Sequence, residues 1–132
     1  DLSGELAQET IRTTGHSIEL RVCAENPAKH FIPSPGPLDL IELPQIKGVR
    51  FDSGFETGDA VTPFYDSLVM KIIARGHDRA EAIARLRNAV ALTRIEGIQS
   101  NLPFLGRLIE HPDFVADRLH TRFVEDHMAS LI

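Results

Sequence analysis

The sequence predicts an α+β fold, in which a mainly antiparallel β-sheet is accompanied by about three helices toward the C-terminus. Apolar and polar residues alternate with a period of two over residues 15–27 and again over residues 67–75, as in half-buried strands. From Asp78 onward the apolar residues instead recur at steps of three and four, which indicates amphipathic helices. Because the strands come first and the helices later, the order favours α+β over a doubly wound α/β domain.

The first strand, over residues 15–27, carries the clearest candidate for a functional side chain. One face holds His16, Ile18, Leu20, Val22 and Ala24, and the opposite face holds Ser17, Glu19, Arg21, Cys23 and Glu25. Arg21 is a planar guanidinium on a rigid strand, which suits a carboxylate, phosphate or oxyanion ligand. The alternative is a solvated strand face on which Glu19 and Glu25 neutralise Arg21, since surface ion pairs are common and weak.

Shorter elements follow the first strand. Residues 28–36 are rich in proline and glycine, which favours a shaped loop and excludes a helix. Residues 38–43 and 48–51 predict short strands, separated by Pro44. Residues 67–75 then predict a long central strand.

Three helices are expected in the remaining chain. Asp78 and Glu81 have the spacing of a capping box, so they mark the start of the first helix. Asn101 is expected to cap the second helix, which ends at residues 111–112, His-Pro. Thr121 is expected to cap the third.

Length and charge exclude several classes of protein. A chain of 132 residues is enough for one domain with a core. The net charge of -5 and the pI near 5.6 argue against a nucleic-acid partner. No apolar run approaches the roughly 18 residues that a membrane helix needs, and no signal-peptide pattern is present, so we expect a soluble, cytoplasmic protein without a membrane partner. The chain begins at Asp1 rather than Met, as in a domain excised from a longer polypeptide.

The patterns of several common catalytic and metal sites are missing. Cys23 is the single cysteine, which excludes an internal disulfide and a paired-cysteine zinc site. The six histidines show no HExxH or short paired spacing, so no metal site is predicted. Neither a phosphate-binding glycine loop nor a G-x-S-x-G elbow occurs. The polar residues that remain, Arg21, Arg50 and residues 65–67, suit a site or an interface made mostly elsewhere.

Six sequence blocks resemble, in order and spacing, the carboxy-terminal domain of biotin carboxylase. They are GHSIELRVCAENP from Gly15, FIPSPG from Phe31, GVRFDSG from Gly48, FYDSLVMKII from Phe64, RAEAI from Arg79 and EGIQSNLPFL from Glu96, followed by HPDF and TRFV. The resemblance implies that residues 15–132 form this domain and that residues 1–14 are a linker from the preceding ATP-grasp lobe.

The resemblance also implies an activity. The chain would belong to a ligase, the biotin carboxylase component of a biotin-dependent carboxylase such as the acetyl-CoA carboxylase of fatty acid biosynthesis. ATP, Mg²⁺ and bicarbonate would be used to carboxylate biotin on a carrier protein. Arg21 matches the arginine of the family motif G-H-x-x-E-x-R, which lies against biotin and stabilises its enolate-like ureido oxygen. Glu19 and Glu25 either orient Arg21 or are structural.

Further roles follow from the same resemblance. Arg50 and Asp66 match residues at the dimer interface of bacterial enzymes. Lys47 stands where such a homodimer can place an aromatic residue, which implies an altered interface. Phe123 matches an apolar residue that contacts the adenine of ATP. The expected partners are the other lobes, a biotin carboxyl carrier, a carboxyltransferase and a second copy in a homodimer.

Two points stay open. The alternative function is a non-catalytic dimerisation or assembly module of such a carboxylase. The final carboxyl acceptor is not identified by this chain. Because the other lobes are missing, the isolated chain is expected to be inactive and to bind no cofactor.

Overall fold

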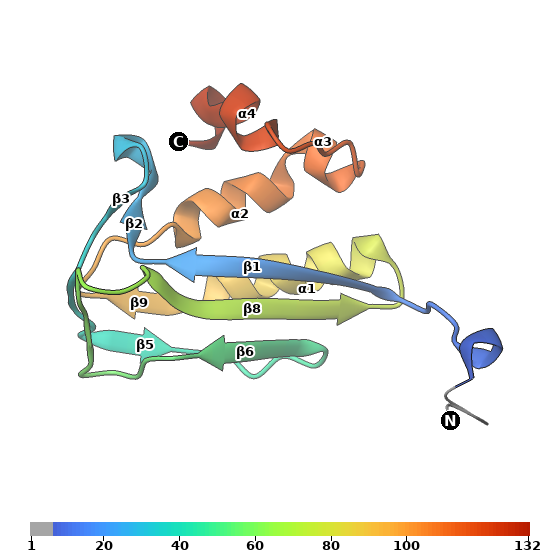
Figure 1. Cartoon of the computed structure of the whole chain (residues 1–132), viewed down its shortest axis with the longest axis horizontal. Helices are drawn as coiled ribbons and strands as arrows, with labels where there is room; N and C mark the ends of the chain where they lie inside the picture. The colour runs from blue at the N-terminus through green and yellow to red at the C-terminus, as the bar shows by residue number, and fades with distance from the viewer. Residues whose placement is uncertain (1–6) are drawn as a thin grey trace.

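The computed structural model describes residues 7–132, so residues 1–6 of the expected linker lie outside the described part. The strands are β1 (His16–Cys23), β2 (Glu25–Asn26), β3 (Ile32–Pro33), β4 (Gly36–Pro37), β5 (Leu40–Glu42), β6 (Val49–Ser53), β7 (Ala60–Val61), β8 (Leu68–Gly76) and β9 (Arg94–Glu96). The helices are α1 (Arg79–Leu92), α2 (Leu102–Glu110), α3 (Pro112–Val115) and α4 (Phe123–Leu131), with 3₁₀ turns at Gln8–Thr10 and Pro27–Lys29. The strand pairs are antiparallel and most of the helical residues follow them (Figure 1), so the predicted α+β class is confirmed.

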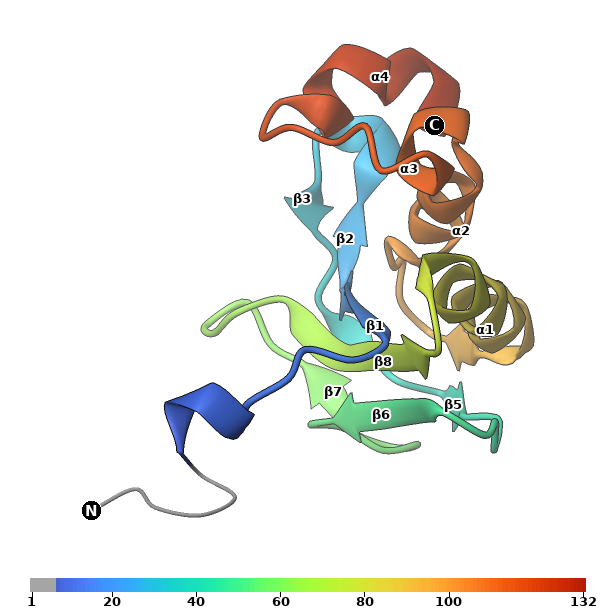
Figure 2. The ribbon, with the colours of Figure 1, turned by 90° about the vertical axis from the view of Figure 1, so that its right-hand side faces the viewer.

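β8 is the central strand of a three-stranded sheet, with β1 on one side and β6 on the other. Leu20 is paired with Ile72 and Val22 with Met70, so the apolar faces predicted for the two long strands coincide. These four side chains are at most 4% exposed. α1 packs on β8 and α2 on β1, and Figure 2 shows both helices on one side of these strands. The opposite face of the sheet carries mainly polar side chains, with the half-buried Ile73 among them.

The smaller strands differ from the expected ones. A bulge between Val22 and Cys23 ends β1, so the strand predicted over residues 15–27 is divided into β1 and β2. β2 pairs with β3 inside the segment expected to be a loop. The strand predicted over residues 38–43 is reduced to β5, because the Leu38 amide bonds the Asp59 carbonyl instead of a strand partner.

The start of α1 is as predicted. The Asp78 side chain accepts a hydrogen bond from the Glu81 amide at 2.8 Å, which satisfies one of the free N–H groups of the first turn. Ile83 and Leu86 are buried on the side of α1 that packs on the sheet. Within residues 7–132, no helix is both long enough and apolar enough to cross a membrane.

Of the two other predicted helix caps, one is correct in position only and one is wrong. Asn101 is the N-cap residue of α2, as predicted, but its side chain makes no capping bond, because it bonds the backbone of β1 instead. α4 begins at Phe123 after Arg122, so Thr121 is not its cap. The expected stop at residues 111–112 ends α2, but the chain then forms the short helix α3, whose first turn is capped by the His111 side chain.

Candidate functional site

One face of the three-stranded sheet is open and charged, and we call it the polar face. Residues paired across strands point to the same side of a sheet. Arg21 on β1 is level with Lys71 on β8, which is level with Asp52 on β6. In the same way Glu19 shares a row, across β8, with Arg50. The polar face therefore presents Glu19, Arg21, Arg50, Asp52, Lys71 and Arg75.

The Arg21 guanidinium is available to a ligand. Its side chain is 55% exposed, and one of its terminal nitrogens lies 3.6 Å from a carboxylate oxygen of Asp66, which is 70% exposed. An ion pair this loose and this exposed is worth about 0–1 kcal/mol. Arg21 can therefore leave Asp66 for a better acceptor at little cost.

The two glutamates that flank Arg21 have other partners. Glu19 lies 3.9 Å from the Lys71 ammonium, and Glu25 accepts a hydrogen bond from the Ser67 hydroxyl at 2.5 Å. Neither the prediction that these glutamates neutralise Arg21 nor the prediction that they orient it is therefore supported by the described contacts. The carboxylate paired with Arg21 comes instead from Asp66, 45 residues further along the chain (66 − 21).

The backbone next to Arg21 is braced by Asn101. Its side-chain oxygen accepts from the Cys23 amide at 2.8 Å, and its side-chain nitrogen donates to the Arg21 carbonyl at 3.1 Å. The Asn101 amide also donates to the Cys23 carbonyl at 3.1 Å. Asn101 is 7% exposed and spans the bulge that follows Val22. Sequence reasoning missed this role, because an asparagine before a helix has the pattern of an N-cap.

Cys23 is not a nucleophile of the ordinary activated kind. Its side chain is buried, and burial first, then Glu25, raises the pKa of the thiol. A raised pKa lowers the thiolate fraction at neutral pH. The expectation that Cys23 is a small strand residue agrees with this environment.

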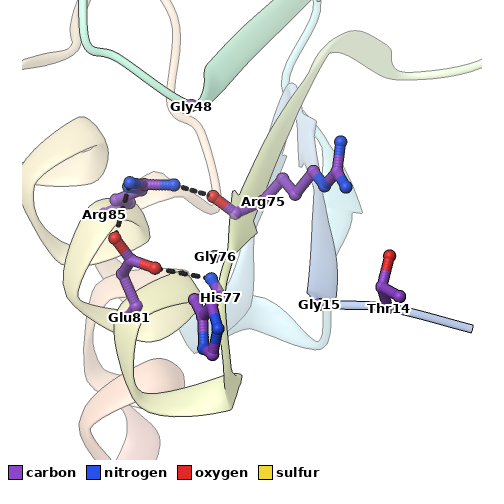
Figure 3. Close-up of a pocket in the computed structure, with 8 residues that line it drawn as sticks. All are labelled: Thr14, Gly15, Gly48, Arg75, Gly76, His77, Glu81 and Arg85. Atoms are coloured by element: carbon purple, nitrogen blue, oxygen red, sulfur yellow. Dashed lines mark hydrogen bonds and ion pairs between the residues drawn. The ribbon is translucent and has the colours of Figure 1, made fainter.

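A hollow of about 610 Å³ lies at the other end of β1, away from Arg21. It is lined by Thr14, Gly15, Gly48, Arg75, Gly76, His77, Glu81 and Arg85. Figure 3 shows that its polar groups bond one another: Glu81 accepts from Arg85 and from the His77 amide, and Arg85 donates to the Arg75 carbonyl. These hydrogen bonds therefore connect the end of β8 to α1. The residues that line the hollow show no arrangement of acid, base and nucleophile.

Comparison with known proteins gives the family. A family model described as the biotin carboxylase C-terminal domain matches residues 19–126. The chain belongs to this family. Biotin carboxylase 1 of Bacillus subtilis is 43% identical over 122 residues, which are 92% of this chain and 27% of that protein. Pyruvate carboxylase 1 of Caenorhabditis elegans is 37% identical over 124 residues, which are 93% of this chain and 11% of that protein.

Solved biotin carboxylase domains have the same fold. The biotin carboxylase domain dimer of Hydrogenobacter thermophilus 2-oxoglutarate carboxylase, in complex with MgADP, ADP and bicarbonate, has a TM-score of 0.92 at 34% identity. That comparison covers 96% of this chain and 28% of that chain. The complete pyruvate carboxylase of Rhizobium etli has a TM-score of 0.90 at 34% identity, covering 96% of this chain and 13% of that one. The chain thus spans about a quarter, or less, of the biotin carboxylase relatives that it matches.

The three interface residues expected from the biotin carboxylase resemblance do not contact the same partners. Arg50 is paired with Asp52 on the same strand, with Nε 2.9 Å from a carboxylate oxygen. Lys47 is exposed in the turn before β6 and, with Arg50, lines a shallow hollow of about 640 Å³ formed by residues 43–47, 49, 50 and 51. Asp66 belongs to the Arg21 pair instead. A role in a biotin carboxylase dimer stays a prediction for all three.

Phe123 is placed inside the domain. Its side chain is 5% exposed, stacks on the His127 ring with centroids 4.5 Å apart and meets the His111 ring edge-to-face at 5.3 Å. Little of the ring is therefore left for another contact within residues 7–132. The contact of Phe123 with adenine in a biotin carboxylase stays a prediction. In this structure the Phe123 ring packs the start of α4 against the rest of the domain.

Two aromatic side chains next to Asp66 are unusually exposed. Phe64 is 84% and Tyr65 is 87% exposed. Large aromatic side chains side by side in water are a common feature of surfaces that receive a partner. In a biotin carboxylase that extends beyond this chain, the segment before β8 is therefore a candidate contact surface adjacent to Arg21.

Proposed function

We propose that this chain is the C-terminal lobe of a biotin carboxylase, in which ATP and bicarbonate are used to carboxylate biotin on a carrier protein. The observation that supports this most directly is Arg21. It is a permanently charged guanidinium on a strand whose backbone is braced by Asn101, and its one described ion pair is loose and exposed.

Arg21 is the residue of this lobe that we assign to the chemistry. Bound biotin would supply the ureido nitrogen that accepts the carboxyl group, and Arg21 would face the negative charge on its ureido oxygen once that nitrogen is deprotonated. Arg21 is suited to donate hydrogen bonds to this oxygen. A fixed cation directed at charge that develops during the reaction stabilises the transition state more than the neutral ground state.

The ATP phosphates, Mg²⁺ and bicarbonate are assigned to parts of the enzyme outside this chain, and Phe123 stays the candidate contact for the adenine ring. The sequence has no glycine-rich phosphate loop. On the polar face the described carboxylates Glu19 and Asp52 are each paired with a neighbouring cation, so they are poorly suited to hold Mg²⁺. The isolated chain should therefore neither hydrolyse ATP nor carboxylate free biotin.

The test is a coupled assay of ADP release by the full-length protein. In the presence of Mg²⁺ and bicarbonate, the rate should rise when free biotin is added and should fall to background when bicarbonate is omitted. The 132-residue chain alone should give no ADP under the same conditions. ATP hydrolysis that does not respond to biotin or to bicarbonate would contradict the proposal.

The larger assembly is proposed on the same basis. We expect a biotin carboxyl carrier and a carboxyltransferase to act with this lobe in the cytoplasm, on the same polypeptide or on separate ones. An acetyl-CoA carboxylase of fatty acid biosynthesis is one such assembly. Matched relatives are named for methylcrotonoyl-CoA, pyruvate and other acyl-CoA acceptors, so the acceptor must be chosen by a different domain.

A second function, assembly through the polar face, is favoured by the exposed side chains at one edge of the sheet. Arg50 is 71% exposed on β6, and Lys47 is exposed in the turn before that strand. A dimer related by two-fold symmetry would bury the same patch on both protomers. This function is compatible with catalysis at Arg21.

Replacing Arg50 with glutamate should weaken self-association of the full-length protein by at least tenfold. The change puts a like charge beside Asp52, so both the native pair and any cation offered to a partner are lost. Sedimentation velocity over a concentration series measures this directly. Arg87→Glu is the matched control, since Arg87 is an exposed residue of α1. Equal association of the two variants would remove Arg50 from the interface.

A further inference from the structure

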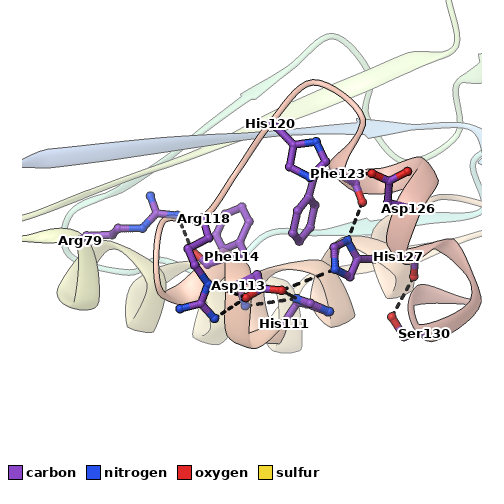
Figure 4. Close-up of polar contacts among 10 residues, drawn as sticks. All are labelled: Arg79, His111, Asp113, Phe114, Arg118, His120, Phe123, Asp126, His127 and Ser130. Carbon is purple, nitrogen blue, oxygen red and sulfur yellow. Dashed lines mark hydrogen bonds and ion pairs between the residues drawn. The ribbon is translucent and has the colours of Figure 1, made fainter.

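Three side chains that can bind a metal ion converge where α2, α3 and α4 meet. His111 follows α2, Asp113 lies in α3, and His127 lies in α4 (Figure 4). One potential ligand atom from each residue lies within 4.8 Å of the other two. The side chains are 16%, 30% and 28% exposed, so the cluster is partly buried but open to solvent.

The hydrogen bonds of the two histidines direct a lone pair from each ring toward Asp113. His127 Nδ1 lies 2.9 Å from the Phe123 carbonyl oxygen, which can only accept, so Nδ1 carries the proton. In the neutral ring Nε2 is then an acceptor, and it lies 3.5 Å from Asp113 Oδ2. His111 Nδ1 accepts from the Asp113 amide at 3.2 Å and lies 4.0 Å from the same Oδ2.

The carboxylate of Asp113 is held in place by its other oxygen. Arg118 bonds Oδ1 through Nε at 2.8 Å and through a second guanidinium nitrogen. This hydrogen-bonded pair lowers the pKa of Asp113, with smaller contributions from His111 and His127. Oδ2, the oxygen that Arg118 does not bond, faces His127 Nε2 at 3.5 Å and His111 Nδ1 at 4.0 Å, so these three atoms surround one position that a cation can occupy.

We propose that His111, Asp113 and His127 form a binding site for a divalent transition-metal ion, with Zn²⁺ as the best fit. Two imidazole nitrogens and one carboxylate oxygen are ligands that zinc prefers, and they leave a fourth tetrahedral position for water. Imidazole ligands do not suit Mg²⁺, which prefers oxygen, so the site is distinct from any Mg²⁺ bound with ATP.

The geometry needs small adjustments to hold the ion. Ligand atoms at about 2.0–2.2 Å from zinc are roughly 3.3–3.6 Å from each other in a tetrahedron, so the observed separation of 3.5 Å already fits and that of 4.0 Å must shorten somewhat. Binding at His111 Nδ1 replaces its long hydrogen bond from the Asp113 amide. The bonds from Phe123 to His127 and from Arg118 to Asp113 stay in place and orient the two ligands, as outer partners do in known metal sites.

A bound ion would tie the C-terminal helix to the rest of the domain. α4 is otherwise held by the burial of Phe123 and Leu131 and by a hydrogen bond of 2.7 Å from Arg107 to the Leu131 carbonyl. A ligand that binds the folded state alone raises its stability by mass action. The metal is therefore expected to stabilise the packing of α4 rather than to take part in the carboxylation.

The test is Zn²⁺ binding to the full-length protein after treatment with a chelator, followed by calorimetry and by thermal melts with and without the ion. The wild-type protein should bind one Zn²⁺ at this site and melt at a higher temperature with it. His127→Gln should weaken this binding at least tenfold. His120→Gln is the matched control. The His120 ring also lies beside the Phe123 ring, with centroids 6.2 Å apart, but His120 is not one of the three proposed ligands.

A second measurement separates metal binding from a folding defect. Co²⁺ in place of Zn²⁺ should give the intense visible absorption of a tetrahedral site in the wild type and in His120→Gln, and a weak one in Asp113→Asn. Far-ultraviolet circular dichroism checks that each variant is folded. Equal Zn²⁺ affinity in wild type and His127→Gln would overturn the proposal. A wild-type melting temperature that changes with pH but not with Zn²⁺ would also overturn it, because a proton on a histidine would then take the place proposed for the metal ion.

Discussion

Replacing Arg21 with glutamine in the full-length protein should lower kcat for biotin carboxylation by roughly 10²–10³-fold, the usual effect of removing one donor from a developing oxyanion. The KM for ATP should stay the same, because the loss concerns charge on biotin and not the binding of nucleotide. Glutamine is uncharged and two atoms shorter than arginine, so the variant removes both the charge and the guanidinium donors. Steady-state kinetics with free biotin measures both constants.

A lysine at position 21 should recover little of the rate. Lysine keeps the charge but lacks the planar guanidinium, which can bond the ureido oxygen while it lies against the biotin ring. The pKa of a lysine ammonium also falls in a desolvated site. Arg21→Lys therefore separates charge from geometry. Arg75→Gln is the control, since it removes the same charge from the same polar face near the opposite end of β8. An unchanged kcat in Arg21→Gln would remove Arg21 from the mechanism and leave only the family membership.

The pairing with Asp66 refines this expectation. Arg21 must turn from Asp66 to meet a substrate, and the pair is exposed on both sides and 3.6 Å long. Breaking it costs at most about 1 kcal/mol. The pair with Asp66 is therefore not expected to limit the role that we propose for Arg21.

The two long strands were predicted correctly because the alternation of apolar and polar residues lies within each strand. Alternation identified the face of β1 that presents Arg21, and the register with β8 confirms that face. The Asp78 cap was found for the same reason, since cap and amide are three residues apart. Such features depend on neighbours in the chain, so the sequence alone is sufficient to find them.

Contacts between distant residues were not predictable in this way. The flanking glutamates were the obvious partners for Arg21, yet folding supplies Asp66 from the segment before β8. His111 and His127 have no recognisable metal spacing, and α3 with the following turn brings them together. In both cases the partner is selected by tertiary structure, on which a short sequence window has no bearing.

Replacing Asn101 with alanine should lower both the stability of the domain and the rate of carboxylation. The change leaves the Cys23 amide and the Arg21 carbonyl without their side-chain partners in a site where Asn101 is 7% exposed. Each buried group left unpaired costs about 1–3 kcal/mol, so the free energy of unfolding should fall by roughly 2–6 kcal/mol. Urea denaturation of the full-length protein, followed for the transition of this domain, measures that loss.

The rate should fall for a separate reason. With its carbonyl released, the backbone of Arg21 at the β1 bulge gains freedom, and a guanidinium that is misplaced by about 1 Å loses much of its effect on a transition state. Asn101→Ala should therefore lower kcat more than it changes the KM for ATP, even at temperatures at which the variant is fully folded. In this proposal Asn101 is a positioning residue that acts on the reaction through Arg21.

A variant of matched stability distinguishes positioning from general destabilisation. Leu86 is fully buried on α1, and Leu86→Ala should cost about 2–5 kcal/mol while it leaves the hydrogen bonds around Arg21 intact. If both variants are folded and Leu86→Ala keeps the wild-type kcat while Asn101→Ala loses it, the brace positions the guanidinium. Equal rates in the two variants would limit Asn101 to stability. Combining Asn101→Ala with Arg21→Gln sharpens the result, because a residue that acts through Arg21 has little further effect on kcat once that guanidinium is gone.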